Sequence, residues 1–307
     1  EHWLNMRVLF VGDAISGKVI LEEIKKVGEL VALAVPGRDQ KKLLNNEFLT
    51  IKTSKINETS IIDKLKSLNI DLLINFNSSI ILSKDLLSCL TIGGINFHPG
   101  LLPRYAGSNV HQWAMLDNER WSGVTIHVIE DKIDAGPILH ISKTEILMAD
   151  TGLTLYIKLI RVGSQLIAQL LPKIAKQGFV FSKPQKFSNR KFFLKSKKVE
   201  RQINFNQNVL NVHRFIQALN YRPAISPLGH SFIDAPLSAI EPVRIGVVEN
   251  TLPADTVPGE ILQIDKKCVS IACKDGSIDI KKFWFENKLV GAIDGATASG
   301  MRVGQIM

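Results

Sequence analysis

The chain has 307 residues, of which 45% are hydrophobic and 22% are charged, and it carries a formal net charge of +9. The length favours two domains, because domains usually contain about 100–200 residues. No apolar run reaches the ~18 uninterrupted residues that a membrane span needs, and no signal peptide is found. We therefore expect a cytoplasmic globular protein with no membrane partner. The positive charge favours an anionic partner, such as a nucleic acid or a nucleotide.

Cysteine usage is sparse. The chain has only Cys89, Cys268 and Cys273, and their spacing matches no zinc-binding pattern. A disulfide framework is not expected, which fits a reducing cytoplasm, and the three thiols are interpreted as small buried hydrophobes.

Short apolar runs alternate with segments of helical periodicity over the first hundred residues. The runs at 6–12, 30–35, 71–76 and 92–97 are predicted strands, and 16–29, 61–68 and 83–90 are predicted helices, the last with Ser83 as its N-cap. This alternation predicts an α/β domain with a doubly wound, mostly parallel sheet. The glycines at 12 and 17 lack the third glycine of a dinucleotide-binding loop, so a nicotinamide cofactor is not expected.

Two more strands and a long helix follow. Residues 123–129 and 137–146 are predicted strands, and 151–175 form an apolar-periodic helix capped by Asp150 or Thr151. Pro172 is expected to kink this helix or to end it early, since proline lacks the N–H that an interior helical position donates.

The composition changes after Gly178. We assign residues 181–205 to a basic linker, because 183–201 hold eight lysines and arginines against one acid. The segment is either a solvated connector or a strip that binds phosphates. Residues 206–307 open with a predicted helix, 209–219. Short β-like runs at 231–233, 243–248, 259–264, 268–272 and 277–280 then predict a smaller, OB-like β-barrel domain.

Three polar residues stand out between the predicted strands of the first domain. Asn96 and His98 are two residues apart near the end of strand 92–97, so their side chains share one face, at the edge where open parallel sheets bind ligands. Asp134 lies in a loop and is followed by small residues. An amide can stabilise an oxyanion, an imidazole can move a proton and a carboxylate can tune the imidazole, which suits acyl transfer.

Each of the three also has a purely structural interpretation. Asn96 could cap strand backbone, His98 could be a core histidine with satisfied hydrogen bonds, and Asp134 could form a turn with Gly136. Their occurrence together, with prolines and glycines in the loop after His98, favours the chemical interpretation.

The motif Asn96-Phe-His98-Pro-x-Leu-Leu-Pro-x-Tyr-x-Gly107 is followed by Gly-Val-Thr-Ile-His127 and by Asp134-Ala-Gly-Pro-Ile. This combination resembles the signature of the 10-formyltetrahydrofolate-dependent formyltransferases. The resemblance covers roughly residues 6–180 and implies a Rossmann-like formyltransferase catalytic domain over that range, with no metal.

The resemblance also implies roles for individual residues. Asn96, His98 and Asp134 would be catalytic: an amine attacks the formyl carbon, Asn96 and a protonated His98 stabilise the oxyanion, and Asp134 favours the imidazolium and relays the amine proton. The pterin of the folate donor would lie between two loops. The residues expected there are Ile80, Ile81, Leu82, Ile129, Glu130 and Asp131.

The acceptor amine is less well defined. Residues 203–262 resemble the C-terminal module of methionyl-tRNA formyltransferase, and the net charge agrees with that member. Two departures count the other way: the loop 36–42 is short, and 75–79 differs from the subfamily pattern. A third departure, Gly100 in place of the usual serine after His-Pro, removes a local hydrogen bond and bears on substrate positioning. The acceptor is therefore expected on methionyl-tRNA or on a small metabolite such as an amino-sugar nucleotide.

Residues 107–113 lie where acceptor contacts would be expected. His111 and Trp113 belong there or to a packed helix, and packing is favoured for Trp113. Two other functions rank lower. Hydrolysis of formyltetrahydrofolate is disfavoured, because related hydrolases usually carry an extra N-terminal domain that is not expected before Met6. A non-catalytic, basic RNA-binding protein with a vestigial folate site conflicts with the presence of all three polar residues.

Overall fold

The computed structural model describes residues 5–36, 48–180, 182–249 and 252–307. These residues form two compact units, each drawn from several parts of the chain. The first unit holds the described residues of Glu1–Ser108, Ser122–Glu145 and Ile157–Phe193, and the second those of Asn109–Trp121, Ile146–Tyr156 and Leu194–Met307. The predicted domain limits at residues 180 and 205 stay a prediction, and most of the short loop 36–42 lies outside the described residues.

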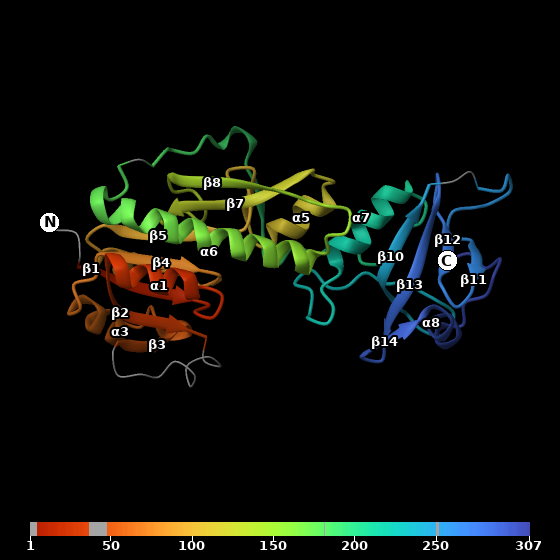
Figure 1. The fold of residues 1–307 in the computed structure, drawn as a ribbon, viewed down its shortest axis with the longest axis horizontal. Helices are drawn as coiled ribbons and strands as arrows, with labels where there is room; N and C mark the ends of the chain where they lie inside the picture. Colours follow the sequence, from red (N-terminus) through yellow and green to blue (C-terminus); the bar gives the residue numbers. More distant parts are fainter. Residues whose placement is uncertain (1–4, 37–47, 181, 250–251) are drawn as a thin grey trace. The chain divides into compact units, whose positions relative to one another are not determined.

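The first unit is built on a seven-stranded sheet (Figure 1). Its strands, in spatial order, are β3 (Leu49–Lys52), β2 (Gly28–Val35), β1 (Met6–Gly12), β4 (Leu72–Phe76), β5 (Gly93–His98), β7 (Trp121–Val128) and β8 (Ile138–Glu145). β1 to β5 pair in parallel and β7 runs antiparallel to β5. The predicted α/β class with a mostly parallel sheet is confirmed, whereas β3 was not predicted.

Helices cover both faces of this sheet: α1 (Lys18–Val27), α3 (Thr59–Lys66), α4 (Lys84–Leu87) and α6 (Gly152–Gln177). Phe97 of β5 points to the face that α6 covers, where a side chain at Gly163 would meet its ring. On the opposite face, Leu73 of β4 packs in one core cluster with Leu65 of α3 and Leu86 of α4. Because side chains alternate along a strand, Asn96 lies on the α3 and α4 face.

Local signals set several helix ends. The Ser83 hydroxyl accepts a hydrogen bond from the Leu86 N–H, which confirms the predicted cap of α4. The Thr151 hydroxyl accepts from the Thr154 N–H at 3.1 Å, next to the start of α6. The predicted early end at Pro172 was wrong, because α6 continues to Gln177. Burial of Leu171, Ile174 and Ala175 favours the longer helix despite the lost backbone hydrogen bond.

The second unit combines helices with an antiparallel sheet. Its helices are α5 (Val110–Leu116), α7 (Val209–Leu219) and α8 (Ala292–Ser299), and its sheet strands are β10 (Glu241–Val248), β11 (Ile261–Ile264), β12 (Val269–Ala272), β13 (Ser277–Phe285) and β14 (Lys288–Gly291). The order is β10-β13-β12-β11, with β14 also on β13. The smaller β-rich C-terminal part is thus confirmed. The pairings among its described residues do not close the sheet into a barrel, and 231–233 form only isolated bridges.

A short two-stranded sheet lies within the first unit. β6 (Tyr105–Gly107) pairs in parallel with β9 (Lys191–Phe193). Just before β9, Lys183 exchanges two backbone hydrogen bonds with Ile138 of β8. Over residues 183–193 the basic segment is therefore packed against the first unit.

No helix in the described part of the chain is both long and apolar enough to cross a bilayer. All three cysteines are free. Cys273 is buried as expected, whereas Cys89 and Cys268 are only half-buried.

Candidate active site

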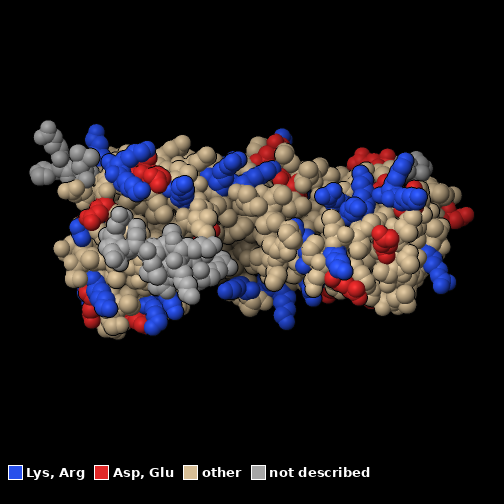
Figure 2. Space-filling model, turned by 60° about the horizontal axis from the view of Figure 1, so that its bottom comes forward, with Lys and Arg blue, Asp and Glu red and all other residues tan. Residues whose placement is uncertain are grey.

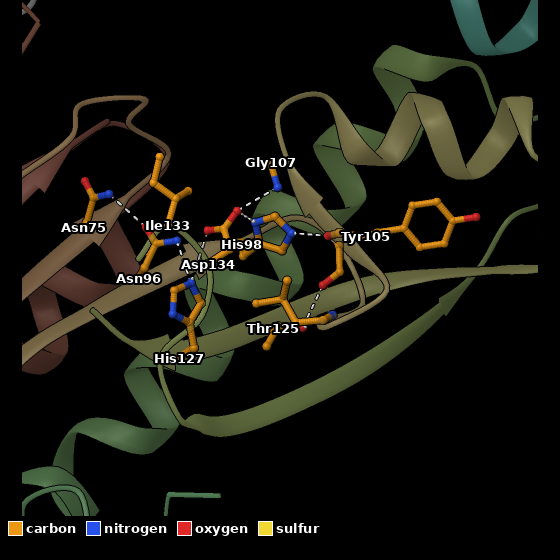
Figure 3. Close-up of polar contacts among 12 residues, drawn as sticks. Asn75, Asn96, His98, Tyr105, Gly107, Thr125, His127, Ile133 and Asp134 are labelled. Carbon is orange, nitrogen blue, oxygen red and sulfur yellow. Dashed lines mark hydrogen bonds and ion pairs between the residues drawn. The ribbon is translucent and has the colours of Figure 1, made fainter. Parts of the chain in front are cut away.

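Strand register places three polar residues in a row across the first sheet. Asn75 of β4 lies beside Asn96 of β5, which lies opposite His127 of β7. Asn75 Nδ2 donates to Asn96 Oδ1 at 2.8 Å (Figure 3). Asn96 Nδ2 lies 3.0 Å from His127 Nε2, which accepts because His127 Nδ1–H donates to the Val128 carbonyl. These contacts fix which way the Asn96 amide points and use one of its two Nδ2 hydrogens.

His98 ends β5 and is almost completely buried, with 3% of its surface exposed. Its Nε2–H donates to the Tyr105 carbonyl at 2.6 Å. This bond fixes the tautomer, so Nδ1 is the nitrogen that can take up a proton. Nδ1 lies 3.5 Å from Asp134 Oδ2.

Asp134 reaches His98 from the loop between β7 and β8. Its backbone φ of 50° lies in the left-handed region, which residues other than glycine adopt only at a cost in conformational free energy. Oδ2 accepts the Gly107 N–H at 2.8 Å, and Oδ1 lies 3.5 Å from His127 Nε2. The structure therefore brings the three predicted catalytic residues, Asn96, His98 and Asp134, into one cluster.

Burial and charge act in opposite directions on the His98–Asp134 pair. Burial lowers the pKa of His98 below its usual value, although the charge of Asp134 raises it. Burial raises the pKa of Asp134, but the interactions with His98 and His127 and the Gly107 N–H bond outweigh this and hold that pKa well below its usual range. At neutral pH the resting pair is thus a neutral imidazole beside a carboxylate. The protonated His98 was expected when the oxyanion forms, which is a later state of this pair, and it stays a prediction.

Two glycines of the motif are required by close backbone approaches. A Cβ on Gly107, which has a φ of +95°, would lie 2.3 Å from the Phe193 carbonyl oxygen of β9. A Cβ on Gly136 would lie 1.9 Å from the Val128 carbonyl oxygen. Both glycines therefore let backbone pack tightly around Asp134.

Three supporting residues had no predicted role: Asn75, Thr125 and His127. The Thr125 hydroxyl donates to the Gly100 carbonyl at 2.7 Å and accepts the Leu102 N–H at 3.1 Å, which ties the loop after His98 to β7. Thr125 and His127 are two residues apart on one strand, so this spacing could have indicated a shared face. Asn75 carries no such signal, because its role depends on strand register.

The six residues expected around the pterin lie in two neighbouring loops of the first unit. Ile80, Leu82 and Ile129 are partly buried against one core cluster. Asp131 forms a 2.6 Å ion pair with Lys84, which opens α4 directly after the first of these loops. Ile81 is 66% exposed, and Glu130 and Asp131 are also exposed. The loops are brought together, while contact of these side chains with a ligand stays a prediction.

His111 and Trp113 lie on α5 in the second unit and are both buried. His111 Nε2 bonds to the Tyr221 hydroxyl, and its ring stacks on Tyr156 at 4.7 Å between centroids. Burial lowers the pKa of His111 to about 3. Trp113 is 7% exposed, and the Lys197 ammonium lies 4.5 Å from its ring centroid. The packed-helix interpretation therefore describes both residues.

Comparisons with known proteins identify both parts of the chain. The formyl transferase family model matches residues 26–171, and the model of the formyl transferase C-terminal domain matches residues 195–294. A methionyl-tRNA formyltransferase from Nitrosospira multiformis is 26% identical over 290 residues, which is 90% of each chain.

Solved structures share the fold. An N-formyltransferase from Helicobacter canadensis, in complex with folinic acid and dTDP-3-aminofucose, gives a TM-score of 0.64 at 17% identity, over 90% of this chain and 98% of that one. HypX from Aquifex aeolicus, in complex with tetrahydrofolic acid, gives a TM-score of 0.63 at 18% identity. That match spans 97% of this chain but only 48% of HypX. Because both domain models match in the expected order, the chain belongs to the formyl transferase family and is an enzyme that transfers formyl groups.

Proposed function

We propose that the enzyme moves the formyl group of 10-formyltetrahydrofolate to a primary amine, with Asn96, His98 and Asp134 as its catalytic residues. The observation that carries the proposal is the convergence of an oriented amide N–H, a buried neutral imidazole and a carboxylate in one cluster. Formyl transfer needs these three functions: a donor for the oxyanion, a base for the amine proton and a charge that stabilises the protonated base.

In the first step, the amine nitrogen attacks the formyl carbon and the carbonyl oxygen becomes an oxyanion. The Asn96 Nδ2 hydrogen that is not used by His127 donates to this oxygen. Because Asn75 and His127 hold both ends of the Asn96 amide, little reorganisation is needed when the charge develops.

The amine proton passes to Nδ1 of His98, the nitrogen left without a proton by the Tyr105 bond. The resulting imidazolium lies beside Asp134, which compensates for its burial. In the second step the bond breaks between the formyl carbon and N10, the folate nitrogen that carried the formyl group. His98 then returns the proton to N10. The products are the N-formylated amine and tetrahydrofolate, and the protein is restored.

Donor binding is assigned to the two loops that hold Ile80 to Leu82 and Ile129 to Asp131. Their partly buried apolar side chains suit the flat pterin ring, and loop backbone groups are available for its polar edge. The folate compounds bound by the Helicobacter canadensis enzyme and by HypX, which share this fold, support a folate donor.

Methionyl-tRNA is the acceptor that we favour. The Nitrosospira multiformis methionyl-tRNA formyltransferase aligns over 90% of both chains, including the C-terminal part. The net charge of +9 suits a polyanionic acceptor. Figure 2 shows lysine and arginine side chains at many separate points of one face, with acidic side chains among them. A sugar-linked amine is the second candidate, because the fold also matches the Helicobacter canadensis enzyme with its bound amino-sugar nucleotide.

Donor consumption by the purified enzyme tests both parts of the proposal. Charged initiator methionyl-tRNA and a panel of amino-sugar nucleotides are offered separately, and formylated product is measured by mass spectrometry. Turnover with the tRNA that falls as salt rises is the expected result. Turnover only with a small amine would replace the acceptor, and formate release that needs no amine would identify a hydrolase.

A further inference from the structure

The loop that carries Asp134 is held by side chains from the basic segment. Gln185 Nε2 donates to the carbonyls of Gly136, at 2.7 Å, and of Asp134, at 3.1 Å. Arg190 Nη1 donates to the Asp134 carbonyl at 2.8 Å, and Nη2 to the Ile133 carbonyl at 2.6 Å. Three donors from this segment thus hold the carbonyls on both sides of the Asp134 backbone turn.

Arg190 is itself fixed in place. Its guanidinium lies over the Phe187 ring at 5.3 Å and over the Phe192 ring at 5.6 Å from the centroids. The planar fork of arginine matches two neighbouring carbonyls, which a lysine ammonium cannot do in the same geometry. The positive charge of Arg190 therefore lies against carbonyls and aromatic rings of the first unit.

The same segment also acts on the carboxylate of Asp134. Directly after Arg190 the chain forms β9, which pairs with β6. β6 ends at Gly107, whose N–H donates to Asp134 Oδ2. One stretch of chain thus fixes the carbonyl of Asp134 through Gln185 and Arg190, and its carboxylate through the β6–β9 pair.

We propose that Arg190, assisted by Gln185, is a positioning residue that keeps Asp134 in its left-handed conformation and its carboxylate beside His98. The left-handed φ of 50° is unfavourable for aspartate by itself, so the loop needs outside contacts to keep it. The catalytic consequence rests on the proposed function, in which Asp134 stabilises the His98 imidazolium.

Kinetics of three variants test the positioning role. Arg190→Met removes the fork, Arg190→Lys keeps the charge, and Lys186→Met removes one exposed charge from the same segment as a matched control. Because small displacements of a reacting group cost roughly 100-fold, we expect kcat to fall about 100-fold in Arg190→Met, with little change in KM. We expect a smaller fall in kcat, about 10-fold, in Arg190→Lys, because the substituted lysine can still donate to one of the two carbonyls. In Lys186→Met we expect less than about a twofold fall, because all hydrogen bonds to the Asp134 loop are kept.

The pH profile adds a readout that general destabilisation does not mimic. The acid limb of kcat reports the protonation of His98, the proposed base, whose pKa is lowered by burial, raised by the Asp134 carboxylate and lowered by the charge of Arg190. Gln185→Leu changes no charge, so displacement of the Asp134 carboxylate should move its acid limb to lower pH. Gln185→Leu also leaves Arg190 intact, which keeps the test valid if Arg190→Met folds poorly.

Hydrogen exchange of the Gly107 amide separates this inference from the proposed function. We expect faster exchange in the peptide around Gly107 in Arg190→Met than in Lys186→Met, whatever the activity. An inactive wild type with this faster exchange would reject the proposed function and retain the positioning of the loop. Wild-type kcat and exchange in Arg190→Met, together with a wild-type acid limb in Gln185→Leu, would overturn the positioning role itself.

Discussion

Two histidines are buried to nearly the same extent, one in each unit, and their surroundings differ. His98 is 3% exposed and His111 is 2% exposed. The ring of His98 lies between the Tyr105 carbonyl and the Asp134 carboxylate. The ring of His111 contacts the Tyr221 hydroxyl, and its Nδ1 has no hydrogen-bond partner among the described residues.

The comparison separates the effect of burial on the pKa of a histidine from the effect of a neighbouring charge. Burial is the cause that lowers the pKa of His111 to about 3, so this ring stays neutral at any moderate pH. At His98 the same effect is opposed by Asp134, which makes the imidazolium accessible as a transient state. A buried imidazole is thus a packing element in the second unit and, by our proposal, a base in the first.

The largest expected effect comes from removing the charge beside His98. In Asp134→Asn the buried imidazolium loses its counter-charge, so His98 becomes electrostatically similar to His111. We expect kcat to fall about 1,000-fold, as is typical when a positioned acid–base group stops working. Rapid-quench measurement of formylated product checks this. If Asp134→Asn kept more than about a tenth of the wild-type rate, the role of the carboxylate would be contradicted.

Asn96→Ala removes the amide hydrogen assigned to the oxyanion. Deletion of one such donor costs about 100-fold to 1,000-fold in kcat. Because the interaction develops mainly in the transition state, KM for the donor should change little. Steady-state kinetics with the donor varied check both parameters. A rise in KM at constant kcat would mean that Asn96 binds substrate and does not act on the oxyanion.

Asn75→Leu probes the amide orientation without touching the reacting atoms. The Asn96 Oδ1 atom loses its donor, so the amide can rotate, and we expect about a 10-fold fall in kcat from imperfect geometry. Asn211→Leu is a matched control, because it removes an exposed Asn–Asn hydrogen bond in the second unit by the same substitution. Equal rates for the two variants would show that Asn75 does not orient Asn96.

His111→Gln should affect stability more than activity. The folded pKa of about 3 lies below the usual 6.5, so between these values the unfolded chain binds the proton and stability falls as pH falls. At about 1.36 kcal/mol per pH unit, His111 removes about 2 kcal/mol from the free energy of unfolding between about pH 6.5 and 5. Urea titrations at both pH values should show a smaller loss in His111→Gln. An unchanged loss would place the pH dependence elsewhere, for example at His213, whose pKa burial lowers to about 4.

Local patterns made much of the first unit predictable. Apolar runs ending at Gly12 and Phe76 identified β1 and β4, and Ser83 marked the start of α4. The two-residue spacing of Asn96 and His98 predicted their shared face, because side chains alternate along a strand. Features of this kind depend on a few neighbouring residues and can be read from the chain.

Other features depend on contacts between distant segments. Asn75 orients Asn96 only because β4 and β5 pair in the observed register. Arg190 reaches the Asp134 loop across 56 positions of the chain, and its sequence context suggested only a basic linker. The short strand β3 carries too weak a periodic pattern to be recognised without its partner β2. These contacts become visible only when the distant segments are placed together in the tertiary structure.

The most direct measurement compares His98→Gln with His111→Gln in formyl transfer under the same conditions, at about neutral pH. The two substitutions exchange the same side chain at two equally buried positions, so loss of packing is matched. We predict a fall of about 1,000-fold in kcat for His98→Gln, and a rate within about threefold of wild type for His111→Gln. Near-wild-type turnover by His98→Gln would contradict the account, because the proton would then reach N10 without His98.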